Sequence, residues 1–201
     1  MRSALEALLA RHKDLGIRPV RSRVIRHARH DPAVLQECHE FLRPFLRLAR
    51  YALVAFDWEG CGRSDRREEI ESLVETRLSQ NGWDQRCSAI VIDPELEVWF
   101  WGDSPYVEKV LGWTKGRARL EEWLTEKGYL RQGQRKPRQP KDAVLDAWRL
   151  CKRKPSSSHF GELAENVNFH GCTDPAFEKL CRVLRQWFSV TGLRGGENSG
   201  L

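Results

Sequence analysis

The sequence predicts an α/β fold in which a mainly parallel sheet is flanked by helices and followed by a helical C-terminal part. Two continuous apolar runs, 51–56 and 89–92, are typical of strands buried on both faces of a sheet. Segments with helical apolar spacing lie before, between and after these runs, and this alternation indicates a parallel sheet with helices on its faces. Beyond Gly102 the apolar spacing is helical throughout, which separates the C-terminal part from the sheet.

The first two elements are predicted from apolar spacing and from residues that end helices. Apolar residues recur at helical spacing from Leu5, so a first helix should run to about Leu15 and stop at Gly16. In the segment 20–24, apolar or small residues alternate with arginines, which is the period of a strand. Pro19 just before it favours the beginning of a strand or an edge position.

Acidic residues mark the predicted helix starts in the first hundred residues. Asp31 stands before a proline and is a typical N-cap, and Pro44 predicts a kink or a division into two shorter helices. Asp65 and Glu68 have the spacing of a capping box in front of an apolar stripe. Asp93, again before a proline, should open a helix after the second buried strand.

The C-terminal part should consist of helices joined by short loops. Its apolar stripes predict helices at 106–111, 120–124, 143–151, 160–167 and 177–188, the last capped by Asp174. The chain therefore divides into a predicted α/β core and a helical extension packed on it, and the glycine-rich end should be a disordered tail. These three parts are expected to span residues 1–102, 103–188 and 189–201.

Composition limits the class of protein. With 201 residues and 40% hydrophobic content, the chain can bury a proper core as a single domain. It contains no run of about 18 apolar residues, so no membrane-spanning helix is expected. The six cysteines are scattered without C-x-x-C spacing, which argues against a structural zinc site and favours free thiols in a reducing cytoplasm.

A first candidate site lies where the first buried strand ends. Asp57 and Glu59 are two residues apart, so in extended geometry their side chains would point to the same side. The carboxyl ends of parallel strands are where open α/β sheets place ligands, and carboxylate oxygens suit Mg²⁺ or Mn²⁺. Gly60 and Gly62 would let backbone approach a phosphate closely. The alternative is an ordinary solvated strand end or capping turn.

A second acidic group follows the other buried strand. Asp93, Glu95 and Glu97 would face Asp57 and Glu59 if the two strands pair. Asp93 would then add a metal ligand, and Glu95 or Glu97 would assist catalysis in phosphoryl chemistry. The alternative for Asp93 is helix capping, since acidic residues in a first helical turn favour the helix dipole.

Positive charge is concentrated at the start of the chain. The formal net charge is +6, and residues 1–50 alone hold 11 Lys or Arg against 5 Asp or Glu. Such a basic region suggests a polyanion or an acidic partner, although a solvated positive surface is the alternative. The residues expected to contact nucleic acid phosphates are Arg21, Arg23 and Arg26, together with a second group on a loop, Lys136, Arg138 and Lys141.

Several stretches of the chain carry a family resemblance. They are 52–62, 92–99, 103–105, 136–137, 140–141 and 172–177. Together they resemble Toprim-like proteins encoded in bacterial antiphage defence islands, and in particular a small component of the methylation-associated defence system. The resemblance extends from about Leu5 to Phe188, and 57–62 and 93–99 are its most specific parts.

The resemblance implies a Toprim-like sheet, a role in defence and other proteins of the same system as partners. Toprim enzymes hold Mg²⁺ with a D-x-D pair, which Asp57 and Glu59 match with Glu in the second place. They also use a Glu on a first strand as general acid or base. This chain begins directly with a helix, so either its start is truncated relative to relatives or the protein lacks that strand.

Two functional hypotheses follow. The first is a metal-dependent nuclease module, in which Asp57 and Glu59 hold Mg²⁺ or Mn²⁺ and Glu95 or Glu97 assists cleavage of DNA or RNA. The second is a non-catalytic subunit that binds nucleic acid or partner proteins through its basic face. The missing acidic strand favours the second hypothesis.

Overall fold

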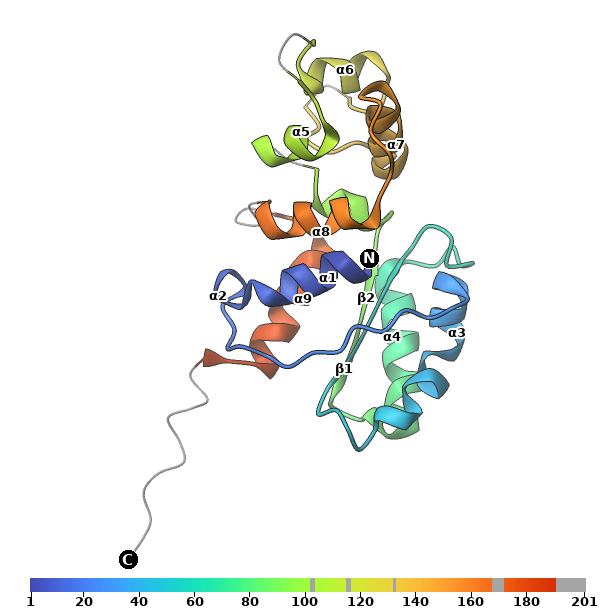
Figure 1. Ribbon diagram of the computed structural model, residues 1–201. Helices are drawn as coiled ribbons and strands as arrows, with labels where there is room; N and C mark the ends of the chain where they lie inside the picture. Colours follow the sequence, from blue (N-terminus) through green and yellow to red (C-terminus); the bar gives the residue numbers. More distant parts are fainter. Residues whose placement is uncertain (102–103, 115–116, 132, 168–171, 191–201) are drawn as a thin grey trace, which may run out of the picture.

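The protein is described by a computed structural model that covers residues 1–101, 104–114, 117–131, 133–167 and 172–190 (Figure 1). In this part of the chain the sheet has two strands, β1 (Ala52–Asp57) and β2 (Cys87–Ile92). They are parallel, with Ala52 opposite Cys87 and Asp57 opposite Ile92. The two carboxyl ends therefore lie side by side, which confirms the predicted parallel pairing of the two buried runs.

One face of the sheet is covered by α3 (His30–Leu42) and α4 (Arg67–Leu78). Alternate strand residues point into this core, where Phe56 and Val91 are fully buried together with Trp83 from the π-helical turn η2 (Ser79–Trp83). The helix α3 ends before Pro44 and is followed by the 3₁₀ turn η1 (Arg43–Phe45), as the proline predicted.

The larger core lies on the other face, where α9 (Pro175–Trp187) packs against β2. It also contains residues of α1, α5, α6, α7 and α8, whose bounds are Arg2–Ala10, Pro105–Leu111, Leu120–Glu126, Pro140–Leu150 and Ser157–Asn166. The helix α1 packs along α8 (Figure 1), so the first helix of the chain shares a core with the C-terminal helices. The proposed boundary at residue 102 stays a prediction.

The first and last helices begin and end as their sequences predict. After α1, the short helix α2 (His12–Leu15) is closed by Gly16, whose φ of 70° is the left-handed conformation that favours glycine. At α9, the Asp174 carboxylate accepts hydrogen bonds from the backbone N–H groups of Ala176 and Phe177, both at 3.0 Å. Residues 191–201 of the predicted tail lie outside the described part of the chain.

Three expectations about local structure are wrong. The segment 20–24 is not a strand: Val20 packs on the larger core instead of pairing with the sheet. Asp31 and Asp65 do not cap the helices they were expected to cap. The helix α3 begins at His30, one residue before Asp31, and α4 begins at Arg67, two residues after Asp65. After Asp93 the chain forms only the 3₁₀ turn η3 (Leu96–Trp99) in place of a full helix.

The outer edge of β2 is closed by side chains of α4. Glu71 accepts a hydrogen bond from the backbone N–H of Val91 at 3.0 Å, and Glu75 accepts one from Ala89 at 2.9 Å. Lys179 of α9 donates to both carboxylates, at 3.1 and 2.8 Å. These groups take the place of a neighbouring strand, because they satisfy the N–H groups that a further ladder would use.

Among the described residues, no helix is both long and apolar enough to cross a membrane.

Candidate functional site

The candidate site is an acidic group at the carboxyl ends of the two strands, where Asp57 is the last residue of β1. Its side chain is partly buried, and Oδ1 accepts a hydrogen bond from the backbone N–H of Leu96 at 2.9 Å. This bond ties the end of β1 to the turn that follows β2. It therefore holds Asp57 close to the segment that carries Glu95 and Glu97.

Glu95 and Glu97 flank Leu96 and are both buried. Glu95 Oε2 accepts a hydrogen bond from the ammonium group of Lys141, at 2.7 Å, in the first turn of α7. Glu97 lies beside a cavity of about 290 Å³ that Lys141 also lines. Asp57, Glu95 and Glu97 are called the acidic site below.

The electrostatics of the acidic site are unusual for carboxylates. Burial raises the pKa of Asp57 to about 7, and the negative charges of Asp31, Glu97 and Glu95 add to the shift. Burial also raises the pKa of Glu97. Perturbed carboxylates of this kind cluster at functional sites, although ion-pair networks that serve structure also produce them.

The other two candidate ligands lie in different surroundings. The strand ends at Asp57, so the alternation that would align the side chain of Glu59 with it does not continue. Glu59 is exposed, and its backbone N–H donates to the carbonyl of Pro94 at 3.0 Å. Asp93 is exposed as well. A metal role for these two residues stays a prediction.

The acidic site has suitable donors for Mg²⁺ or Mn²⁺ but not a suitable arrangement. Its oxygen ligands are of the hard type that these cations prefer. However, nowhere in the described part of the chain do three His, Cys, Asp or Glu side chains lie close enough to hold one metal ion. Glu95 is also already bonded to a lysine. As arranged here, the residues do not fit a preformed metal site.

A separate feature is a group of exposed arginines. Arg21, Arg23 and Arg26 lie on the extended segment 17–27, and the guanidinium of Arg23 lies 5.5 Å from the ring centroid of Phe45 in η1. This contact joins the segment to the turn that follows α3, and three further exposed arginines lie within five residues of Phe45 in the sequence. The arginine surface defined in this way comprises Arg21, Arg23, Arg26, Arg43, Arg47 and Arg50.

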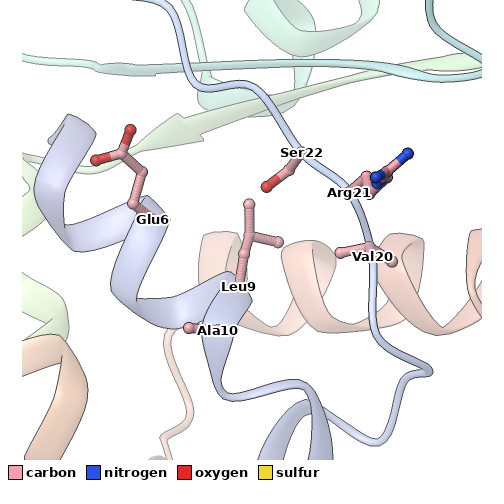
Figure 2. A pocket seen from close by; sticks show the side chains of 6 residues that line it. All are labelled: Glu6, Leu9, Ala10, Val20, Arg21 and Ser22. Carbon is pink, nitrogen blue, oxygen red and sulfur yellow. The ribbon is translucent and has the colours of Figure 1, made fainter.

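No carboxylate within the described ranges pairs with any arginine of this surface, whereas many other arginines of the chain form ion pairs. Beside Arg21, the segment borders a cavity of about 660 Å³ whose other wall is α1. Figure 2 shows Leu9 and Ser22 pointing toward each other across this cavity, while Arg21 is directed away from α1. Arg21 is therefore open to a partner from solution.

The second basic group is placed differently. Arg138 is exposed, but Lys136 is partly buried with its ammonium group 3.8 Å from the sulfur of Cys172. Both precede α7 in the chain, and α7 lies away from segment 17–27 in Figure 1. Lys141 belongs to a helix and not to the loop. A nucleic acid role for Lys136 and Arg138 stays a prediction.

Sequence reasoning missed two features of these sites. The contact of Arg23 with Phe45, which joins segment 17–27 to the turn next to Arg43 and Arg47, had no local signal. The pairing of Lys141 with Glu95, 46 residues apart, had no local signal.

Comparison of the chain with family models, curated proteins and solved structures found no match.

Proposed function

We propose that this chain is a Toprim-like, non-catalytic subunit of a bacterial antiphage defence system that binds nucleic acid through the arginine surface. The defence role and the Toprim-like identity rest on the resemblance of the sequence. The binding role rests on one observation: six exposed arginines, on two segments joined by the Arg23–Phe45 contact, have no carboxylate partner in the described part of the chain.

Unpaired arginines are chemically suited to phosphates. The guanidinium group is always charged and presents a planar set of donors that matches phosphate oxygens. Contacts to phosphates carry no sequence information, so the surface would hold a strand without reading its bases. Aromatic rings adjoin the same region: Arg50 lies 5.3 Å from the ring centroid of Tyr51, which stacks on Trp187 at 4.6 Å. These rings are partly buried. An unpaired base that reached them would add stacking, which favours a single strand.

The test is the salt dependence of binding to a labelled single-stranded oligonucleotide, measured by fluorescence anisotropy. We expect the triple variant Arg21→Gln, Arg26→Gln, Arg47→Gln to bind about 10- to 1,000-fold more weakly. The slope of log K against log salt should also fall by roughly 0.7 for each phosphate that the variant no longer neutralises. Arg23 is left intact because it packs on Phe45.

The matched control is the triple variant Arg66→Gln, Arg119→Gln, Arg149→Gln. It removes the same charge from exposed arginines that already have acidic partners. Equal losses of affinity in the two triple variants would mean that only net charge matters, and the arginine surface would not be a binding site.

A second candidate function is metal-dependent cleavage of nucleic acid phosphodiesters at the acidic site. The pKa of about 7 at Asp57 favours it, because a carboxyl poised near neutral pH suits general acid or base catalysis. In a cleavage assay on labelled DNA and RNA with Mg²⁺ or Mn²⁺, this function requires activity in the wild type that Asp57→Asn abolishes. Activity that survives in Asp57→Asn would belong to a contaminant or to another site.

A further inference from the structure

Lys141 gives the acidic site a positive charge of its own. We propose that its ammonium group takes the place of a divalent cation among Asp57, Glu95 and Glu97, so that the site is neutralised by the chain and does not bind metal. This inference concerns the acidic site alone and is independent of the arginine surface.

The direct contact is the hydrogen-bonded ion pair between Lys141 Nζ and Glu95 Oε2, at 2.7 Å. The Glu95 side chain is only 7% exposed, whereas that of Lys141 is 53% exposed. A buried carboxylate needs a positive partner or strong hydrogen bonds, and the lysine provides both. Lys141 also interacts electrostatically with the other two carboxylates. The hydrogen bond to Glu95 and the negative charges of Glu95, Glu97 and Asp57 together raise the pKa of Lys141.

The position of Lys141 is built into the fold. It is the second residue of α7, directly after Pro140, which begins that helix. The buried indole of Trp101 donates a hydrogen bond from Nε1 to the carbonyl of Pro140 at 2.9 Å. Trp101 lies four residues after Glu97 in the sequence. Its hydrogen bond to Pro140 therefore holds the start of α7, and with it Lys141, close to Glu95 and Glu97.

There is also room beside the ammonium group. Lys141 and Glu97 line the same cavity of about 290 Å³, together with apolar residues such as Val144 and Phe160. Among the described residues no other side chain donates a hydrogen bond to Glu97, which lines the cavity beside Lys141. A metal ion could therefore enter, but it would first have to displace Lys141 from Glu95, and this competition weakens metal binding.

The experiment is a calorimetric titration of the full chain with Mn²⁺ at neutral pH. Lys141→Met keeps the apolar stem of the lysine but removes its charge. We expect the wild type to bind Mn²⁺ too weakly to saturate and Lys141→Met to bind at least about 10- to 100-fold more tightly than that limit, the factor that one charge-assisted hydrogen bond represents. Lys141→Arg, which keeps the charge, should behave like the wild type. Adding Asp57→Asn to Lys141→Met should remove the gain.

Tight stoichiometric Mn²⁺ binding by the wild type, unchanged or weakened in Lys141→Met, would overturn the proposal and strengthen the case for cleavage. Absence of any gain in a folded Lys141→Met would also overturn it. Thermal unfolding followed by circular dichroism establishes that the variant is folded, and Lys141→Gln replaces it if it is not. Oligonucleotide binding should be the same in Lys141→Met and the wild type, so failure here leaves the arginine surface untouched.

Discussion

Replacing Glu71 by alanine should lower the free energy of unfolding by about 3–5 kcal/mol, the usual effect of removing one partner from a buried ion pair. Glu71 is only 3% exposed. Its carboxylate contacts Arg67 at 3.1 Å and Lys179 at 3.1 Å, and it accepts the hydrogen bond from the Val91 N–H. Without it, both cations lack a buried partner and the edge of β2 has an unpaired donor. Urea unfolding followed by tryptophan fluorescence measures the change.

The matched control is Glu68→Ala, one turn earlier on α4. Glu68 also pairs with Arg67, at 2.7 Å, but its side chain is exposed. Exposed pairs contribute little, so this change should leave the stability close to that of the wild type. If the two variants lose equal stability, the Glu71 carboxylate does not close the sheet edge.

Asp57→Asn should have the opposite effect and stabilise the protein at neutral and alkaline pH. The folded chain binds the Asp57 proton more tightly than the unfolded chain, because its pKa is raised from 3.8 to about 7. This contribution to stability is fully present below about pH 4 and is lost as the pH rises through 7. A shift of this size corresponds to roughly 4 kcal/mol at most. Asparagine cannot ionise, and its Oδ1 can still accept the hydrogen bond from Leu96.

The measurement is the melting temperature of wild type and Asp57→Asn between acidic and alkaline pH. We expect the two curves to meet near pH 4 and to separate until about pH 7, with the variant more stable above that point. Glu59→Gln is the control, since Glu59 is exposed and should give a curve close to that of the wild type. Parallel curves for Asp57→Asn would show that Asp57 titrates normally.

The sheet could be predicted because its signal is local. The runs at 51–56 and 89–92 are continuously apolar, which is typical of strands buried on both faces of a sheet. The alternation at 20–24 is equally local, yet a strand also needs a neighbour with free hydrogen-bonding groups. In this chain, Val20 is used for packing on the larger core.

The helix starts show where tertiary contacts override local signals. An acidic residue before a proline correctly predicts the cap at Asp174, where both following N–H groups bond to its carboxylate. The same motif fails at Asp93, since the N–H of Leu96 bonds to Asp57 of the other strand instead. That competition between a local cap and a residue 39 positions away cannot be read from spacing.

The acidic site could be predicted only in part. Asp57, Glu95 and Glu97 were identified because strand ends meet at one edge of a parallel sheet. The lysine that neutralises Glu95 comes from a helix in the C-terminal part, and its nearest sequence signal is the proline before it. Charge neutralisation across 46 residues is a property of the packed molecule.

The packing of α1 on α8 also bears on how the chain is made. Arg11, just after α1, donates hydrogen bonds to the carbonyls of Ala164 and Val167, 153 and 156 residues later. A ribosome adds about 5–20 residues per second, so roughly 8 to 30 seconds separate the synthesis of the two partners. During that interval the apolar side of α1, with Ala4 and Leu8, has no permanent cover. The larger core can therefore close around α1 only after α8 has been synthesised.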